Sequence, residues 1–139
     1  MKISKSKEED LEKIIEILEE FGGDRKDLDY RDFVVAKEGE KLIGCVRIKK
    51  LADCLELASL VVLPEYRKQG IGSGMLKELL TEVLDPVYIL CFKRNLPFYT
   101  ENGFELISVE EMPKSLRDEY ERIIKKPFAK EAEVIVMRK

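Results

Sequence analysis

One stretch of the chain restricts the fold more than any other: LVVLPEYRKQGIGSGML, residues 60–76. A run of apolar residues leads into a basic turn, and the turn leads into a helical pattern that begins with Gly70, Gly72 and Gly74. Glycine in a helix costs roughly 1 kcal/mol relative to alanine, so three of them at a helix start need a physical reason. A helix that begins directly after a buried strand offers backbone N–H groups and the positive end of its dipole. The stretch therefore predicts a local anion site, most naturally for a pyrophosphate.

Two common phosphate-binding loops do not fit this spacing. A P-loop would end in Gly-Lys followed by Ser or Thr, whereas the lysine here, Lys68, precedes the glycines. The dinucleotide fingerprint needs G-x-G-x-x-G, and these glycines run G-x-G-x-G. Composition and spacing alone leave one alternative open, a flexible connection between strand and helix that binds nothing.

The pattern along the rest of the chain predicts one domain over residues 1–139. Ser6 and Glu9 are expected to form a capping box before the first helix. The expected elements are a helix at 7–21, a hairpin at 33–50, strands at 54–63 and 87–92, a short helix and strand in NLPFYTENGFELI, helices at 72–83 and 113–125, and a last strand, AEVIVM. The order β-α-β-β-β-α-β-α-β-α-β mixes hairpins with crossover helices, which predicts an α/β fold, a mixed sheet flanked by helices.

Composition excludes several functional classes. The chain has no histidine, which excludes hydrolases built on a histidine base and argues against a zinc site, so no metal is expected. A net charge of −3 gives no field that favours nucleic acid or an anionic membrane, and no apolar run approaches the roughly 18 residues of a membrane span. With no apolar leader at the N-terminus, we expect a cytoplasmic protein in which Cys45, Cys54 and Cys91 are free thiols.

Two motifs resemble the hallmarks of one family. The segment RKQGIG, residues 67–72, matches the [QR]-x-x-G-x-[GA] signature of the GNAT superfamily of acetyl-CoA-dependent N-acetyltransferases. The segment NLPFYTENGFE, residues 95–105, is similar to that family's second hallmark, an Asn followed by F-Y-x-x-x-G-F. The resemblance covers roughly residues 1–107. It implies the acyl-CoA N-acyltransferase fold, in which strands 54–62 and 87–92 are parallel neighbours that splay into a V, with acetyl-CoA as the co-substrate.

The resemblance also implies which residues contact the cofactor. Backbone N–H groups from Gln69 to Ser73 would hold the pyrophosphate, and the pantetheine arm would pair with the main chain of Leu60 and Val62. Asn95 resembles the family asparagine that hydrogen-bonds the cofactor, with helix capping as the alternative. The full set of cofactor-binding candidates is Leu60, Val61, Val62, Arg67, Lys68, Gln69, Gly70, Ile71, Gly72, Ser73, Asn95 and Tyr99.

Three catalytic roles follow from the same resemblance. The Leu60 N–H matches the position that polarises the thioester carbonyl, and Tyr99 matches the position that protonates the coenzyme A thiolate; packing beside Phe98 is the alternative for Tyr99. Glu56 stands where some members carry a base, and strand alternation would put it on the face of Leu60. The competing interpretation of Glu56 is a solvated charge at a strand end. Asp53 and Glu101 are secondary base candidates.

The acetyl acceptor is the least constrained feature. In such folds the first helix, the loop after it (GGDRKDLDYRD, residues 22–32) and the C-terminal segment build the acceptor site, and the C-terminal segment is similar to that of bacterial acetylglutamate synthases. A primary amine of a small molecule such as an amino acid is expected, with polyamines and lysine-bearing or N-terminal peptide acceptors open. A carboxylate clamp could come from four arginines: Arg25, Arg31, Arg47 and Arg117.

Two further points stay open at this level. A catalytically silent acyl-CoA-binding or regulatory domain would share the glycine turn without needing Tyr99, and only cofactor turnover separates it from an enzyme. The chain is expected to be a monomer or a homodimer, with acetyl-CoA and an amine as its only partners.

Overall fold

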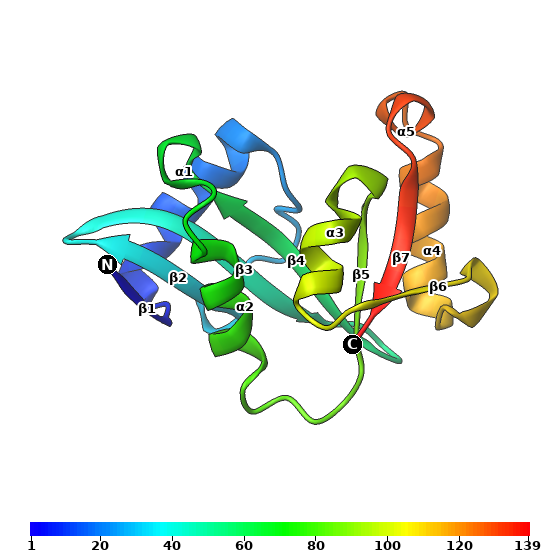
Figure 1. The fold of residues 1–139 in the computed structure, drawn as a ribbon, viewed down its shortest axis with the longest axis horizontal. Coiled ribbons are helices and arrows are strands. Elements are labelled where there is room, and N and C mark those ends of the chain that lie inside the picture. Colours follow the sequence, from blue (N-terminus) through cyan, green and yellow to red (C-terminus); the bar gives the residue numbers. More distant parts are fainter. The chain divides into compact units, whose positions relative to one another are not determined.

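The computed structural model describes every residue from 1 to 139 (Figure 1). The chain divides into two compact units. The N-terminal unit comprises Met1–Lys49 and Leu57–Val83, and the C-terminal unit comprises Lys50–Glu56 and Leu84–Lys139. Strand β4 (Leu55–Val62) contributes residues to both units. Each unit has its own apolar core cluster.

The N-terminal unit places one helix on each face of its strands. Its elements are β1 (Lys2–Lys5), β2 (Phe33–Glu38), β3 (Lys41–Lys50), most of β4, α1 (Leu11–Phe21) and α2 (Ile71–Leu80), with 3-10 turns at Glu8–Asp10, Tyr30–Asp32 and Pro64–Tyr66. Strand β2 pairs antiparallel with both β1 and β3. The apolar side of α1 packs on a cluster that includes Cys45, whereas Met75 of α2 lies against Gly44. Because successive residues of a strand point to opposite faces, the two helices cover opposite sides of β3.

The C-terminal unit is built around an antiparallel arrangement of three strands. Its elements are β5 (Val87–Phe92), a 3-10 turn at Lys93–Asn95, α3 (Leu96–Glu101), β6 (Glu105–Ile107), a 3-10 turn at Val109–Glu111, α4 (Lys114–Ile124), α5 (Phe128–Glu131) and β7 (Val134–Arg138). Strand β7 pairs antiparallel with β5 on one side and with β6 on the other. Met112, just before α4, and Leu116, within α4, pack against Val136 of β7.

The hydrogen-bonded strand order is β1-β2-β3-β4-β5-β7-β6, so the predicted mixed sheet is confirmed with seven strands. Strands β4 and β5 are parallel neighbours, as predicted, with Leu55 opposite Val87 and Glu56 opposite Tyr88. This register involves only the first two residues of each strand, and the splay beyond it remains a prediction. A parallel pair in an otherwise antiparallel arrangement requires a crossover, which α2 provides.

The start of the first helix differs from the prediction. Ser6 does not form a capping box with Glu9, because the Ser6 hydroxyl donates to the Tyr30 carbonyl. The Asp10 carboxylate instead accepts the Lys7 N–H at 2.7 Å. The helix start is thus fixed by a residue one position later than expected, and by a contact 24 residues away that sequence spacing does not show.

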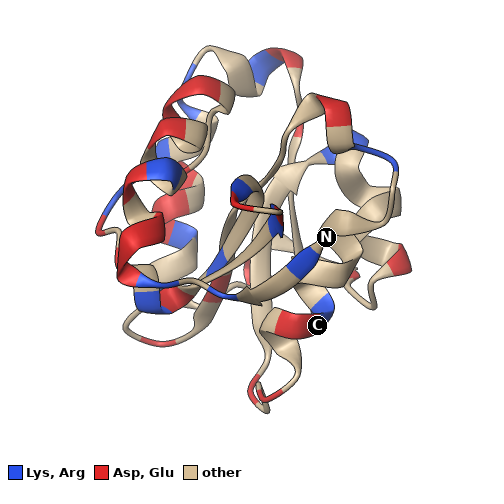
Figure 2. Cartoon of the chain, turned by 90° about the vertical axis from the view of Figure 1, so that its left-hand side faces the viewer, with Lys and Arg blue, Asp and Glu red and all other residues tan.

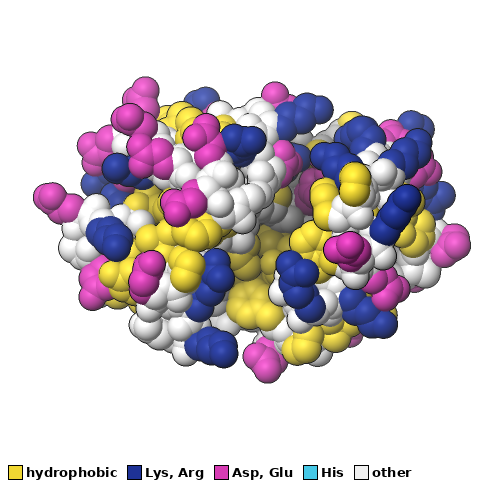
Figure 3. Space-filling view, turned by 90° about the horizontal axis from the view of Figure 1, so that it is seen from above, with side chains coloured by type: hydrophobic (Ala, Val, Ile, Leu, Met, Phe, Trp, Pro, Cys, Tyr) yellow, Lys and Arg dark blue, Asp and Glu magenta, His cyan; other side chains and the backbone are white.

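Charges of both signs are mixed in the two views of the molecule that show them. Lysines and arginines alternate with aspartates and glutamates along the chain (Figure 2), and apolar side chains show between charged ones in the space-filling view (Figure 3). This distribution agrees with a net charge of −3 and with an anion site that depends on local groups. None of the helices combines the length and the apolar character needed to span a bilayer.

Candidate active site

Strand β4 carries a backbone irregularity at its centre. Ser59 has φ of +59°, a left-handed conformation that is uncommon for residues other than glycine. Such a residue interrupts the regular alternation of side chains along the strand. The prediction that Glu56 shares a face with Leu60 rested on unbroken alternation, so that argument fails at Ser59.

The strand leads into the predicted anion turn at the start of α2. Gly70 occupies the N-cap position in the left-handed conformation, with φ of +80°, and Lys68 is also left-handed at +62°. The first intrahelical hydrogen bond joins the Gly74 N–H to the Gly70 carbonyl at 3.0 Å. Backbone N–H groups that precede this bond are the ones a helix start offers to an anion.

The three glycines of the turn have different structural reasons. Gly70 needs its positive φ, and a Cβ there would meet no atom within 4 Å, so the space beside it is open. Gly74 is a packing residue, since its Cβ would lie 2.7 Å from the Cδ1 of Ile3 in β1. Gly72 is half-buried in the first turn of the helix and has an ordinary helical conformation. A positive φ therefore does not explain Gly72, in contrast to Gly70.

The basic residues of the turn are only partly available to a ligand. Arg67 is exposed, but its Nε donates to the Val62 carbonyl at 2.9 Å and its guanidinium lies 6.0 Å from the centre of the Phe21 ring. The other guanidinium nitrogens of Arg67 are donors of the kind that phosphate oxygens accept. Lys68 and Gln69 are exposed beside it, and the Gln69 amide donates to the Glu65 carbonyl at 3.4 Å.

Tyr99 and Asn95 belong to the C-terminal unit. Tyr99, on α3, is 5% exposed, and its ring makes edge-to-face contacts with Phe98 and Phe104, with centroids 5.0 and 5.7 Å apart. Burial, with a smaller contribution from Cys91, raises the pKa of Tyr99 well above that of an ordinary tyrosine, so the phenol stays protonated at neutral pH. Asn95 precedes α3 but makes no side-chain cap, so the capping alternative is wrong.

The carboxylate candidates separate by burial. Glu56 is 5% exposed, so its interpretation as a solvated strand-end charge is wrong. Asp53 accepts the Ser115 N–H at the start of α4 at 3.3 Å; desolvation acts to raise the pKa of Asp53, and the hydrogen bonds from Ser115 outweigh it and lower the pKa. Asp53 therefore serves the helix start, and Glu101 is exposed at the end of α3. No group of three or more His, Cys, Asp or Glu side chains is placed to hold a metal ion.

The four arginines of the expected carboxylate clamp are all engaged within the chain. Arg31 pairs with Asp29 through two nitrogens at 3.0 and 2.9 Å, and Arg25 lies 3.6 Å from Glu19. Arg47 is 1% exposed and bonded inside the N-terminal unit, so it is not a clamp residue. Arg117 donates through Nη2 to the Val109 carbonyl, and its buried Nε has no hydrogen-bond partner.

Comparison with known proteins agrees with the motifs and the fold. The family model described as "Acetyltransferase (GNAT) domain" matches residues 29–106. The chain belongs to the GNAT acetyltransferase family. The matched residues of this GNAT domain include Ser59, the whole glycine turn and both hallmark motifs, residues 67–72 and 95–105.

The similar proteins include an amino-acid acetyltransferase and structures solved with coenzyme A. An amino-acid acetyltransferase of Pseudomonas fluorescens is 37% identical over 86 residues, which are 58% of this chain and 19% of that protein. N-acetylglutamate synthase from Neisseria gonorrhoeae, solved with coenzyme A and N-acetyl-glutamate, has a TM-score of 0.77 at 20% identity and covers 99% of this chain and 34% of that one. A Mycobacterium tuberculosis protein solved with CoA has a TM-score of 0.72 at 19% identity and covers 99% and 98%. The chain thus spans only a fraction of the curated relatives that it matches, and the structural likenesses show the shared fold.

Sequence reasoning missed the conformation of Ser59 and the internal engagement of Arg47. Nothing in the residue pattern of LELASLVV marks Ser59 as left-handed. A serine in an apolar strand has many explanations, and only the three-dimensional structure distinguishes them.

Proposed function

We propose that this chain transfers the acetyl group of acetyl-CoA to the primary amine of an amino acid. The observation that carries the proposal is the start of α2: an open left-handed Gly70 and a half-buried Gly72, directly after β4 and beside exposed basic residues. This arrangement lies within the segment that matches the GNAT family model.

Acetyl-CoA fits the chemistry of these residues. Its pyrophosphate would accept hydrogen bonds from backbone N–H groups over residues 69–73, with Arg67 and Lys68 adding positive charge. The pantetheine arm would run along Leu60, Val61 and Val62 of β4. The solved relatives from Neisseria gonorrhoeae and Mycobacterium tuberculosis that contain coenzyme A support this ligand. Asn95 is proposed as an additional hydrogen-bonding contact to the cofactor.

The transfer needs an oxyanion donor, a base and an acid. The amine nitrogen attacks the thioester carbonyl carbon, the C–S bond breaks, and the thiolate takes a proton while the nitrogen loses one. We assign the Leu60 N–H to the carbonyl oxygen, where one donor is worth about 3 kcal/mol. We assign Tyr99 to the thiolate, because burial keeps the phenol protonated at neutral pH. Glu56, or a water that it holds, is assigned to the amine proton.

The amino acid acceptor is supported by the relatives rather than by a visible clamp. Both the Pseudomonas fluorescens enzyme, by its name, and the Neisseria gonorrhoeae synthase, by its bound product, act on amino acids. Of the four arginines considered from the sequence, Arg117 is the one with an unsatisfied buried donor, its Nε. We assign it as the first candidate for the acceptor carboxylate, because an orphaned donor gains most from a ligand.

A turnover screen tests the proposal. The protein is mixed with acetyl-CoA and single amino acids, polyamines or lysine-containing peptides, and released thiol is measured. An amino acid is expected to give the highest kcat/KM. Tight coenzyme A binding with no turnover on any amine would instead support a silent acyl-CoA-binding domain. Residence in the cytoplasm is also retained as a proposal, and the three free cysteines agree with a reducing compartment.

A further inference from the structure

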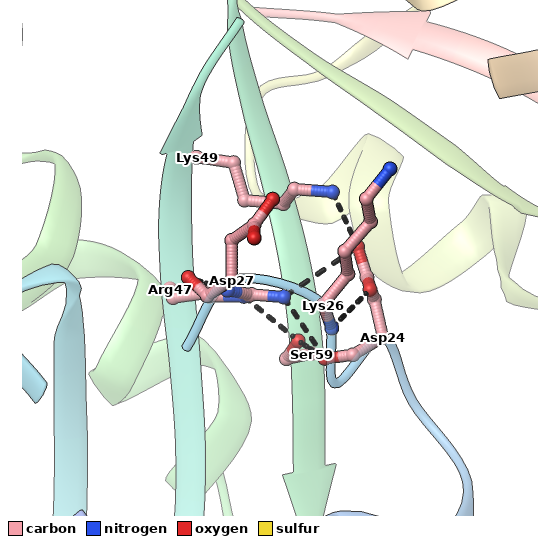
Figure 4. Close-up of polar contacts among 6 residues, drawn as sticks. All are labelled: Asp24, Lys26, Asp27, Arg47, Lys49 and Ser59. Carbon is pink, nitrogen blue, oxygen red and sulfur yellow. Dashed lines mark hydrogen bonds and ion pairs between the residues drawn. The ribbon is translucent and has the colours of Figure 1, made fainter. Parts of the chain in front are cut away.

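Arg47 of β3 is a buried cation that the proposed chemistry does not use. Only 1% of it is exposed, and its guanidinium reaches the loop that follows α1 (Figure 4). Nη2 donates to the Asp24 carbonyl at 2.9 Å and Nη1 to the Asp27 carbonyl at 3.4 Å. Nε donates to the Ser59 hydroxyl at 3.1 Å. A buried guanidinium costs several kcal/mol unless its donors are satisfied, so these contacts hold the side chain and the loop together.

Ser59 closes this arrangement into a triangle. Its hydroxyl accepts from Arg47 and donates to the Asp24 carbonyl at 2.7 Å (Figure 4). The loop lies directly on the irregular point of β4, because a Cβ on Gly23 would be 3.9 Å from the Ser59 Cα and 2.9 Å from the Cδ2 of Leu18. The left-handed residue of β4 and the loop are therefore fixed to each other through one arginine.

The loop, residues 22–29, depends on such external contacts. It has no strand or helix hydrogen bonding of its own, and Gly22, Gly23 and Asp27 all have positive φ values of +80°, +140° and +53°. Backbone carbonyls in such a segment need donors from elsewhere when they are removed from water. Arg47 supplies donors to two of them, at positions three residues apart.

The Asp24 carboxylate adds a second attachment for the same loop. It accepts from the Lys49 ammonium and from the Lys26 N–H, the latter at 2.9 Å, and lies 3.5 Å from Arg47 Nη2. Desolvation acts to raise the pKa of Asp24, but Lys49, the Lys26 N–H and Arg47 outweigh it and lower the pKa. The carboxylate is therefore ionised at neutral pH and stays paired.

We propose that Arg47 is a positioning residue that holds loop 22–29 on β4 at Ser59 and so orients the acceptor side of the site and the neighbouring Leu60 N–H. The proposal rests on the proposed function, in which Leu60 donates to the thioester, and on the expectation from the sequence that this loop borders the acceptor. It assigns Arg47 no contact with either substrate. Loss of Arg47 is expected to change the KM for the acceptor and kcat. Coenzyme A binding should not change, because none of the Arg47 hydrogen bonds reaches residues 69–73.

The test compares Arg47→Met, which keeps apolar volume but loses all four contacts, with Lys50→Met as a matched control. Lys50 is an exposed cation at the end of the same strand, β3, outside the loop. Amide hydrogen exchange in Arg47→Met should rise over residues 22–29 and stay unchanged in α2. Coenzyme A affinity should be kept, while kcat/KM for the acceptor falls roughly ten- to a hundredfold through both kcat and KM. Lys50→Met should match the parent.

Two further variants keep the test decisive. Arg47→Lys keeps the charge, but a single ammonium cannot reach all three oxygens to which the guanidinium donates. Its loss of kcat/KM should therefore be smaller than that of Arg47→Met but not zero. Ser59→Ala should raise exchange in the same loop, and it decides the question if Arg47→Met does not fold. Unchanged loop exchange in Ser59→Ala, or Arg47→Met that loses stability with unchanged kcat and KM, would overturn the proposal. Hydrogen exchange is measured without substrate. It therefore tests whether Arg47 holds the loop even if the parent protein acetylates no amine.

Discussion

Gly74 of α2 lies so close to Ile3 of β1 that a Cβ on Gly74 would meet the Ile3 Cδ1 atom at 2.7 Å. Ile3 Cδ1 is the end of a flexible side chain, so Gly74→Ala should be nearly neutral, with helix propensity offsetting the small displacement. Gly74→Leu should lower the free energy of unfolding by about 1–3 kcal/mol through overpacking. Urea denaturation measures both. Equal stability of the leucine variant and the parent would show that the helix–strand spacing is not tight.

A large side chain at Gly72, two residues earlier, should affect coenzyme A binding rather than stability. Gly72→Glu should keep the fold, because the residue has ordinary helical backbone angles, and should abolish coenzyme A binding by filling the phosphate space with a like charge. Isothermal calorimetry on the folded variant measures the affinity, with Gly74→Ala as the control that keeps it. Parent-like affinity in Gly72→Glu would remove the pyrophosphate from residues 69–73.

These two glycines show what sequence reasoning could and could not reach. The spacing of glycines after an apolar strand located the turn, because the backbone conformation of a turn depends on residues that are neighbours in the sequence. It could not separate Gly72 from Gly74, since the reason for Gly74 is Ile3, some seventy residues away in the chain. Arg47 was misread for the same reason: its partners Asp24 and Ser59 are brought to it by the fold.

Asp10 should make the N-terminal unit sensitive to acid. Its carboxylate is buried, lies 2.7 Å from Lys37 Nζ and accepts the Lys7 N–H. Desolvation acts to raise the pKa of Asp10, but these partners outweigh it and lower the pKa. A depressed folded-state pKa gives stability that is complete above the unfolded value near 3.9 and is lost as the pH falls through the folded value.

Asp10→Asn should therefore cost about 1–3 kcal/mol of unfolding free energy at pH 7. The gap to the parent should stay constant down to about pH 4 and narrow below it, as the parent carboxyl takes up a proton. Urea titrations at pH 7, 4 and 3 measure this, with the exposed Glu9→Gln as the control. Parallel stability curves for Asp10→Asn and the parent at all three values would contradict the assignment.

Glu56 should contribute to the pH dependence of turnover. The rate is expected to rise with pH as the base or the acceptor amine loses its proton, and Glu56→Gln should lower the rate and remove part of that rise. Initial rates of thiol release across pH 6 to 9 measure it, as an ordinary alkylammonium titrates near 10. The exposed Glu105→Gln should leave the profile intact. If Glu56→Gln has the parent rate and profile, the carboxylate is structural and water takes the amine proton.

Tyr99→Phe tests whether the Tyr99 hydroxyl takes part in catalysis, as an enzyme requires and a silent binding domain does not. The variant keeps the ring and its edge-to-face contacts with Phe98 and Phe104, so stability and coenzyme A affinity should barely change. The loss of a general acid should lower the rate by roughly 10²-fold. It should fall on kcat more than on KM, because the proton is needed only as the thiolate leaves.

The matched control for this prediction is Tyr120→Phe, which removes a hydroxyl from a half-buried tyrosine packed against the core of the same unit. Because burial raises the pKa of Tyr99, its proton remains in place through neutral pH, and the parent rate should show no loss from its ionisation below about pH 10. Steady-state kinetics with the best acceptor measure both variants. A Tyr99→Phe protein that turns over acetyl-CoA at the parent rate would mean that solvent, not this phenol, protonates the thiolate. Coenzyme A binding by both proteins with no acetylation on any amine would leave the silent binding domain as the function of this fold.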